Sequence, residues 1–246
     1  VNLLIVDHAA NDKDYKAELA EYFFEDVKIS SLLFMNSSTL SLFSTGRTRG
    51  LVVESGHGVT GSVPVFEGFI LPHATNFSTI SGQDINDQLY KVLSDKGIKL
   101  DKSKILTQEI LKDMKEKILS VPLDYEQMIN GPDPMNEEER TYELPDGITL
   151  LPGGGAYEAG SFIQLDHRDR FSCTEILFRP SLIGSTAAPL HEMIWDSLQK
   201  CDEELRKELY ENIVYSGGTT MLKGFTNRIK YELNYLIPKD VSRADI

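Results

Sequence analysis

Apolar residues occur in two spacings that alternate along the chain. Runs rich in β-branched residues predict strands, and apolar residues three or four positions apart predict helices with one buried face. The expected strands cover Val1–Asp7, Ile29–Phe34, Leu51–Glu54, Val59–Phe66 and Ile213–Tyr215. The expected helices cover residues 11–23, Ser37–Ser44, Asp84–Gly97, Lys104–Leu119, Leu190–Cys201, Asp202–Asn212 and Phe225–Leu233. Strands and helices in alternation indicate an α/β protein.

Short polar residues mark where two of these helices begin. Asn11 and Asp84 are the predicted N-caps, because their side chains can accept hydrogen bonds from first-turn N–H groups. Lys112 and Glu116 are one turn apart and are expected to pair on the outer face of their helix. Polar and glycine-rich stretches at residues 130–140 and 151–160 predict loops.

Two of the predicted strands run into turns that contain glycine. Residues 55–58 read Ser-Gly-His-Gly, and residues 216–221 read Ser-Gly-Gly-Thr-Thr-Met. Glycine has no side chain, so backbone N–H groups at such turns can approach an anion closely. If the fold brings both turns together, they can hold a nucleotide from two sides. Taken alone, each turn is equally explained as a hairpin or a helix start.

Composition narrows the classes of function. The 246 residues are 41% hydrophobic and 26% charged, which suits a soluble globular protein of one large or two small domains. The net charge of −13 argues against direct binding to nucleic acid or to an anionic membrane. No apolar run has the length of a membrane helix and no signal peptide is recognisable, and the missing initiator Met is compatible with a piece of a longer protein.

Other candidate motifs predict no chemistry. Cys173 and Cys201 form neither a disulfide framework nor a zinc motif, which favours a reducing, intracellular setting. The five histidines have no metal-ligand spacing. His167-Arg168-Asp169 resembles a kinase triplet but lacks the other kinase motifs, and Gly153-Gly154-Gly155 is not followed by the Lys-Ser/Thr of a phosphate loop.

Longer motifs carry a family resemblance. They are Gly46-Arg47-Thr48, residues 55–60 (SGHGVT), residues 63–74 (VPVFEGFILPHA), residues 142–147 (YELPDG), Lys200-Cys201-Asp202 and residues 216–221 (SGGTTM). In order and spacing, apart from a glycine-rich insert, they resemble the actin family over essentially the whole chain. The resemblance implies the actin and hexokinase type of ATPase fold, with two lobes closing on a nucleotide.

The resemblance also implies a division of the chain into subdomains. Residues 1–45 match a segment of one lobe, whose first phosphate hairpin has no counterpart in this sequence. Residues 46–80 and 161–246 match the inner, sheet-containing subdomain of the other lobe, with its phosphate loops. Residues 81–160 match its mostly helical outer subdomain, with the insert at 148–160. The chain therefore represents mainly one lobe of two subdomains.

The nucleotide-binding positions of the family can be carried over to this sequence. By resemblance, the second phosphate loop, the ribose and base contacts and the loop over the adenine correspond to Ser55, Gly56, His57, Gly58, Val59, Gly82, Asp84, Lys115, Glu116, Gly217, Gly218, Thr219 and Met221. The implied cofactor is ATP or ADP with Mg²⁺. For Asp84 the alternative is a helix cap, and for Lys115 and Glu116 a solvated helix face. Leu222 stands where the family usually has an aromatic residue near the base.

The hydrolytic positions depart from the family. Glu54 replaces an aspartate that holds the metal through water, and His57 replaces a second aspartate. The glutamine that orients the attacking water corresponds to Ser37 (or to Asn36 after a one-residue slip), and the assisting histidine corresponds to Gly61. Positioning provides most of the catalysis in phosphoryl transfer, so these degenerate positions predict slow or absent ATP hydrolysis.

Three functions are compatible with these residues. The first is an actin-like cytoskeletal protein with an ATP/ADP cleft and weak or absent hydrolysis, in the cytoplasm or, alternatively, the nucleus. The second is a nucleotide-free, actin-related scaffold subunit of a cytoskeletal or chromatin complex, and the third is an active ATPase of the superfamily. The implied partners are copies of itself, actin-like subunits and actin-binding proteins. Residues 178–184 match a segment through which actin subunits meet, with core packing as the alternative.

Overall fold

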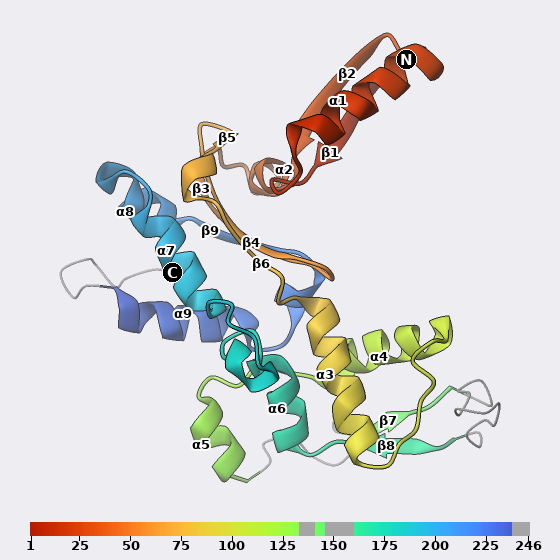
Figure 1. The fold of residues 1–246 in the computed structure, drawn as a ribbon. Coiled ribbons are helices and arrows are strands. Elements are labelled where there is room, and N and C mark those ends of the chain that lie inside the picture. The colour runs from red at the N-terminus through yellow and green to blue at the C-terminus, as the bar shows by residue number, and fades with distance from the viewer. Residues whose placement is uncertain (133–140, 146–159, 238–246) are drawn as a thin grey trace.

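The computed structural model describes residues 1–132, 141–145 and 160–237. A twisted sheet lies at the centre, a small unit projects from it at the N-terminal end, and helices pack below and beside it (Figure 1). The mixture of strands and helices confirms the α/β class that the alternating spacings predict. Among the described residues, no helix has both the length and the apolar character needed to cross a membrane.

The central sheet forms around β3 (Gly50–Ser55), which is hydrogen-bonded on both sides. It pairs antiparallel with β4 (Thr60–Phe66) and parallel with β9 (Ile213–Ser216), while β5 (Phe69–Ile70) and β6 (Asn76–Ser78) pair with β4. Both faces are covered, so the apolar run of β3 is continuous rather than alternating. Leu51 and Val53 pack into the larger hydrophobic cluster and Val52 into a smaller one, so successive residues of β3 pack into different clusters.

The C-terminal part of the chain contains η3 (Pro180–Ile183), α7 (Leu190–Gln199), α8 (Glu203–Glu211), η4 (Gly218–Met221) and α9 (Phe225–Leu236). Of these, α7, α8 and α9 contribute buried residues to the larger cluster. Phe225, Ile229 and Leu233 of α9, which lie four positions apart, have no exposed surface. In α8, Leu209 is buried, whereas Leu205 is only partly buried and packs against the cluster.

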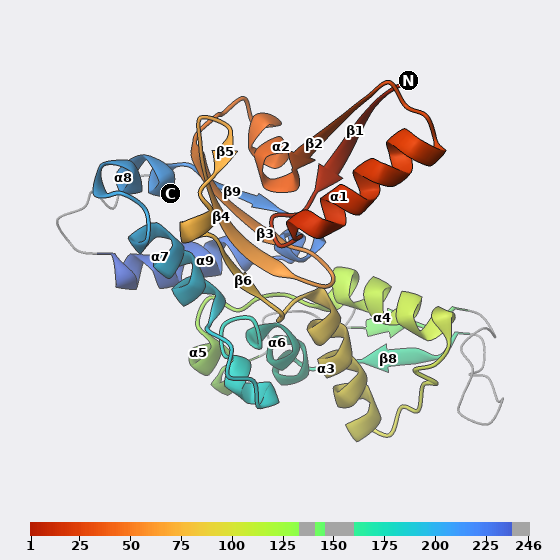
Figure 2. The same ribbon diagram turned by 45° about the horizontal axis from the view of Figure 1, so that its top comes forward.

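A mostly helical unit extends from the other end of the sheet. It contains α3 (Gly82–Asp95), α4 (Ile105–Ile118), α5 (Tyr125–Asn130), β7 (Thr141–Glu143), β8 (Phe162–Gln164) and α6 (His167–Glu175). Figure 2 shows α3, α4 and α6 grouped on one side of the sheet. Because β8 pairs with β7 and α6 packs beside α3, residues 162–175 lie with this unit, beyond the subdomain boundary predicted at residue 161. Of the predicted insert, residues 148–160, all but Gly160 lie outside the described residues.

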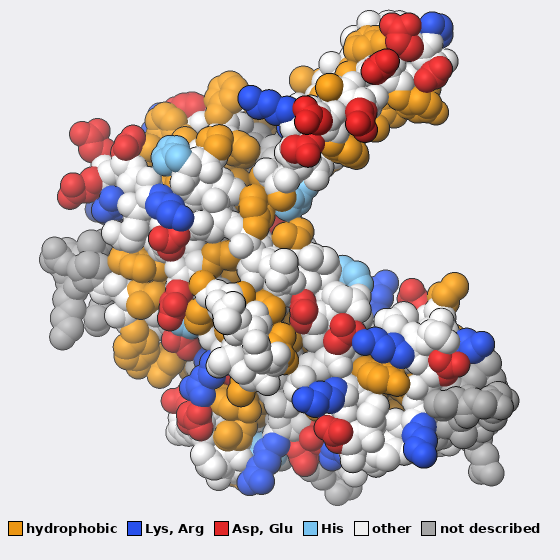
Figure 3. Space-filling view, viewed as in Figure 1, with side chains coloured by type: hydrophobic (Ala, Val, Ile, Leu, Met, Phe, Trp, Pro, Cys, Tyr) orange, Lys and Arg blue, Asp and Glu red, His pale blue; other side chains and the backbone are white. Residues whose placement is uncertain are grey.

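The N-terminal unit has few buried residues. It contains β1 (Asn2–Asp7), α1 (Lys13–Glu21), the π-helical turn η1 (Tyr22–Asp26) and β2 (Ser31–Asn36), which pairs parallel with β1. No residue of α1 is buried. The helix α2 (Ser37–Phe43) then leads into β3 and buries Leu42 against the sheet. The molecule is hollowed between the projecting unit and α4 (Figure 3).

Several local predictions are corrected by the structure. The N-cap of α1 is Asp12, whose carboxylate accepts from the Tyr15 N–H, rather than Asn11. The N-cap of α3 is Ser81 rather than Asp84. The second strand begins at Ser31, two residues later than predicted. Lys112 lies 3.9 Å from Glu109 in an ion pair, so its partner is one turn before it and not Glu116.

Candidate functional site

The turn between β3 and β4 is fixed through its carbonyl groups. The Gly56 carbonyl accepts hydrogen bonds from the Gly82 N–H at 3.0 Å and from the Thr219 hydroxyl at 2.8 Å. The His57 carbonyl accepts from the Gln83 N–H at 2.7 Å and from the Ser81 hydroxyl at 2.6 Å. Two carbonyls of one turn are thus bound to α3 and to the loop after β9, which holds three separate segments together.

Two backbone N–H groups of the same turn have no hydrogen-bond acceptor in the described part of the chain. The Gly56 N–H closes the turn on the Val59 carbonyl at 3.1 Å. The N–H groups of His57 and Gly58 have no acceptor within the described part of the chain, and both residues are exposed. Adjacent N–H groups that are exposed and unbound form a site for an anionic oxygen.

Gly217 brings the second glycine turn against the first. Its φ of +91° lies in the region that favours glycine, and a Cβ there would lie 2.4 Å from the Ser55 carbonyl oxygen. Gly82 is similarly enclosed, because a Cβ would lie 2.8 Å from the Thr219 hydroxyl and 2.9 Å from the Gly56 carbonyl oxygen. Only glycine fits at these two positions without a shift of the neighbouring backbone, so the three segments can approach this closely.

The first turn of α3 is stabilised by a capping box. The Asp84 carboxylate accepts from the Ser81 N–H at 2.8 Å and from the Ser81 hydroxyl at 3.3 Å. Asp84 therefore takes the capping role that the sequence left as the alternative, from position N3 of the helix. Its binding role toward a ribose stays a prediction.

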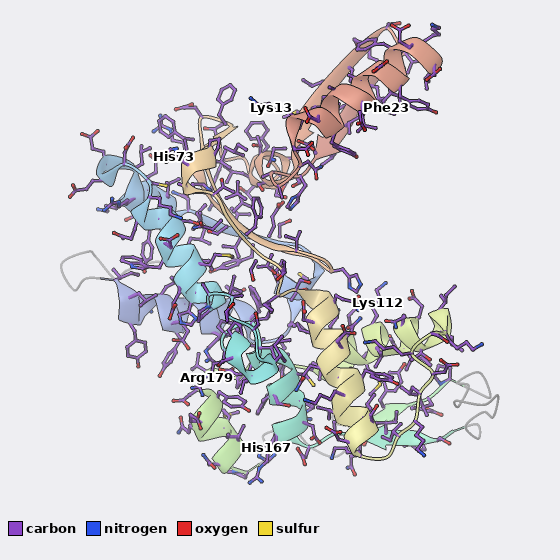
Figure 4. All side chains as sticks on the ribbon, in the orientation of Figure 1. Lys13, Phe23, His73, Lys112, His167 and Arg179 are labelled. Atoms are coloured by element: carbon purple, nitrogen blue, oxygen red, sulfur yellow. The ribbon has the colours of Figure 1, made fainter. Side chains whose placement is uncertain are left out.

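Helix α4 contributes a buried amine. The Lys115 Nζ donates to the Gly82 carbonyl at 3.1 Å, and the residue is 7% exposed. Burial lowers the pKa of Lys115 below its ordinary value, because the charged ammonium loses hydration. Glu116 is exposed, as is Lys112, which lies on α4 beside the hollow in Figure 4. Lys115 is therefore buried, whereas Lys112 and Glu116 on the same helix are exposed to solvent.

These segments enclose a cavity of about 570 Å³. The residues that line it are Gly56, His57, Gln83, Asn86, Gln108, Glu109, Lys112, Lys115, Glu116, Gly218, Thr219 and Leu222. The structure thus brings together six of the predicted site residues from the β3–β4 turn, α4 and η4. Ser55, Gly58, Val59, Gly82, Asp84, Gly217 and Met221 do not line it.

The predicted residues that do not line the cavity have identifiable positions. Ser55 is buried and its hydroxyl lies 2.9 Å from that of Thr60, so it joins the two strands of the hairpin. Met221 is 83% exposed. Gly58 and Val59 continue the turn, and Gly82 and Gly217 form the close approaches described above.

Sequence reasoning missed polar residues from the helices. They are Gln83 and Asn86, one turn apart on α3, and Gln108 and Lys112, which lie two turns and one turn before the predicted Lys115 on α4. Helical spacing from Gly82 and from Lys115 is a signal that identifies these neighbours. The glycine turns alone do not indicate that these polar helix residues line the cavity.

The position predicted to hold a metal through water is engaged within the protein. The Glu54 Oε2 accepts hydrogen bonds from the Ser37 hydroxyl at 3.1 Å and from the Ser38 hydroxyl at 2.9 Å. The His8 Nε2 lies 3.9 Å from the same oxygen. In the described ranges, no three His, Cys, Asp or Glu residues gather as a metal site would require.

Gly61 is packed against an aromatic ring. A Cβ at this position would lie 2.9 Å from the Phe77 Cε1, across the pairing of β4 with β6. The Phe77 ring also faces His8, with 5.4 Å between ring centroids. An aromatic side chain therefore fills the space beside the position where the sequence comparison expects a histidine.

The kinase-like triplet His167-Arg168-Asp169 forms the first turn of α6. Asp166 is the N-cap of α6, and the side chains of His167 and Arg168 lie 3.3 Å and 3.1 Å, respectively, from the Ile129 carbonyl oxygen. Figure 4 labels His167 at this end of the molecule. Asp169 forms an ion pair with Lys96 at 2.6 Å. These contacts connect α6 to α5 and α3, which is a structural role.

Taken together, a mixed sheet flanked by helices presents two glycine turns to one cavity, which defines an α/β protein with a cavity between its sheet and its helices. In a comparison with protein families, the family model described as Actin matches residues 1–245. The chain belongs to the actin family, and its fold is the α/β fold of the actin-like ATPases. The resemblance and the fold class predicted from the sequence are thereby confirmed. The family fold generally binds ATP or ADP with a divalent metal ion.

Proposed function

We propose that this chain is an actin-like structural protein that binds ATP or ADP in the cavity between the β3–β4 turn, α3, α4 and η4, and hydrolyses it slowly or not at all. One observation carries the proposal. The carbonyls of Gly56 and His57 are bound to α3 and η4, while the N–H groups of His57 and Gly58 stay exposed and unbound. This arrangement favours an anionic oxygen at the β3–β4 turn, beside the cavity that Gly56 and His57 line.

The cavity residues fit a nucleotide better than they fit a metal ion. Lys112 and Lys115 place two amines in the lining, beside the carboxylates of Glu109 and Glu116, and Lys112 is paired with Glu109. The turn supplies N–H donors, and a volume of about 570 Å³ is of the size of a small-molecule site. For Mg²⁺, the side-chain set is poor, because the Glu54 carboxylate already accepts two serine hydroxyls.

Weak hydrolysis follows from the residues beside Glu54. Ser37 donates its hydroxyl to Glu54, and its short side chain has no amide with which to orient water. Gly61 has no side chain, and the Phe77 ring fills the adjoining space. Without groups that position a water molecule, phosphoryl transfer loses its main source of acceleration.

An assembly role is supported by an exposed apolar segment. Leu182 and Ile183 on η3 are 45% and 36% exposed, respectively, whereas Phe178 at the start of the segment is buried in the larger cluster, so core packing applies to only part of residues 178–184. Apolar side chains that remain exposed in a short helix are suited to contact another subunit. We infer that the partners are copies of this chain or actin-like subunits, within the cytoskeleton of the cytoplasm.

The test is a calorimetric titration of the protein with ATP and ADP, with and without Mg²⁺. A Cβ at Gly58 would meet no atom within 4 Å, so Gly58→Val preserves the fold but covers the exposed N–H groups. We expect binding by the wild type and at least about tenfold weaker binding by Gly58→Val, the equivalent of one charge-assisted hydrogen bond. Gly97→Asn, at the end of α3, is the matched control, because asparagine tolerates the positive φ.

A nucleotide-free scaffold is the second candidate. It is favoured by the engagement of Glu54 and by Leu222, which is 7% exposed and offers no aromatic face to a base. Absence of ATP and ADP binding by the wild type would support the scaffold and reject the nucleotide-binding function. Equal affinities of the wild type and Gly58→Val would instead show that the β3–β4 turn is not the phosphate site.

A further inference from the structure

Asn86 differs from the other polar side chains that line the cavity. It is 2% exposed, and its Oδ1 is shielded from water and has no hydrogen-bond partner in the described ranges of the chain. Buried polar atoms are nearly always paired, so an unpaired one calls for a ligand, a water or a cost in stability. Asn86 lies one turn after Gly82 on α3 and lines the cavity.

The two neighbouring amides have protein partners that hold them. The Gln83 Nε2 donates to Asp87 at 3.2 Å, and the Gln108 Nε2 donates to the Lys102 carbonyl at 3.0 Å. The buried amine of Lys115 is likewise held by the Gly82 carbonyl. Among the amide side chains of the described cavity wall, Asn86 alone therefore has a buried acceptor without a donor.

The position of Asn86 on α3 indicates which part of a nucleotide its side chain would contact. The exposed N–H groups of His57 and Gly58 lie at the β3–β4 turn, where anionic oxygens are favoured. Asn86 is a full turn into α3, beyond the N-terminal turn that approaches Gly56 and His57. A ligand with its phosphates at the β3–β4 turn would place its nucleoside along α3 and α4. Leu222 contributes no aromatic face there, so polar contacts must provide the discrimination.

We propose that Asn86 is a specificity-determining residue, which recognises the nucleoside by accepting a hydrogen bond from one of its donors. The donor is either the exocyclic amine of adenine or a ribose hydroxyl, since each supplies an N–H or O–H of the required kind. The inference rests on the proposed nucleotide binding and adds the residue that selects the nucleoside.

The experiment combines Asn86→Leu with nucleotide analogues, by calorimetry on the purified protein. The analogues are ITP, which lacks the adenine amine, and 2′-deoxy-ATP and 3′-deoxy-ATP, which each lack one ribose hydroxyl. In the wild type, the analogue that lacks the paired donor should bind about tenfold more weakly than ATP. In Asn86→Leu, ATP should lose about the same factor, and the preference for ATP over that analogue should disappear.

The melting temperatures of the Asn86 variants distinguish a role of this residue in nucleoside recognition from a structural role. Leucine has the branching of asparagine but bulkier methyl groups, and it removes an unpaired polar atom, so the two effects oppose each other and the melting temperature of the nucleotide-free variant should change little. Gln88→Leu on the same helix, outside the cavity lining, is the matched control and should change neither affinity nor selectivity. Asn86→Ala provides a second, smaller substitution, for which the same loss of selectivity is expected.

The outcomes are distinguishable from those of the proposed function. If the wild type binds ATP and Asn86→Leu keeps both the affinity and the ratios among analogues, the role of Asn86 is rejected while nucleotide binding stands. A lower melting temperature with unchanged ratios would make Asn86 a structural residue. If the wild type binds neither ATP nor any analogue, the nucleotide-binding function itself fails, and the role of Asn86 with it.

Discussion

Two regions beside the β3–β4 turn differ in whether their polar side chains have hydrogen-bond partners within the described protein. In the helical region, formed by α3 and α4, Asn86 has an unpaired Oδ1 and the neighbouring cavity is open. In the sheet region, at the end of β3, the Glu54 carboxylate is already bound by Ser37 and Ser38, and Phe77 packs on Gly61. The first region has an unpaired polar atom and the second has protein partners for its polar groups. Under the proposed function, the residues that would bind the nucleotide are therefore different from those at the hydrolytic positions.

The largest effect is expected where the two glycine turns meet. In Gly217→Val, the new Cβ would lie 2.4 Å from the Ser55 carbonyl oxygen, and the positive φ adds strain. We expect the free energy of unfolding to fall by about 3 kcal/mol and nucleotide binding to be lost. Thermal unfolding and calorimetry measure the two effects.

Gly218→Val is the matched control for that substitution. A Cβ at Gly218 would meet no atom within 4 Å, although the residue lines the cavity. This variant should keep its melting temperature and lose affinity, so that only the ligand is affected. Wild-type stability and affinity in Gly217→Val would contradict the close approach of the two turns.

A smaller effect is expected in the sheet region. Gly61→His places a Cβ 2.9 Å from the Phe77 ring, so this overpacked variant should lose about 2 kcal/mol of stability. In Gly61→His with Phe77→Ala, the ring is absent and the loss caused by histidine should largely disappear. Chemical denaturation of the wild type, both single variants and the double variant measures this coupling. Strictly additive effects would show that Phe77 does not occupy the space beside residue 61.

The sequence predicted the buried framework well, for a physical reason. Leu51, Val52 and Val53 are buried in β3, and the apolar faces of α3, α4, α7 and α9 are buried as their spacing indicates. Burial of apolar surface follows directly from residue type and period. The two glycine turns were also identified, because only a small set of residues permits a close backbone approach.

The contacts between distant polar residues were not predictable in the same way. The pairing of Lys112 with Glu109 rather than Glu116 depends on rotamers that the sequence does not specify. The packing of Phe77 on Gly61 depends on the register of β6 against β4. Asn86 was missed because its type suits a solvated helix face, and only the tertiary arrangement reveals that its Oδ1 is buried and unpaired.

The smallest expected effect is that of Glu54→Gln, which tests whether the sheet region is satisfied without a metal ion. The amide keeps the size of the carboxylate but loses the charge that strengthens the hydrogen bonds from Ser37 and Ser38. Stability should therefore fall by about 1 kcal/mol. Affinity for ATP should stay within about twofold of the wild type, with or without Mg²⁺, because the carboxylate is engaged by protein donors.

Ser38→Ala removes one of the same hydrogen bonds from the other side and provides the partner for a double-mutant cycle. If Glu54 acts by accepting from the serines, the stability losses of Glu54→Gln and Ser38→Ala should be less than additive. If instead Glu54 holds a metal ion through water, Glu54→Gln should weaken binding of ATP only when Mg²⁺ is present, with additive stability losses. That result would make the sheet region a second ligand-binding part of the site and would remove the contrast with α3 and α4.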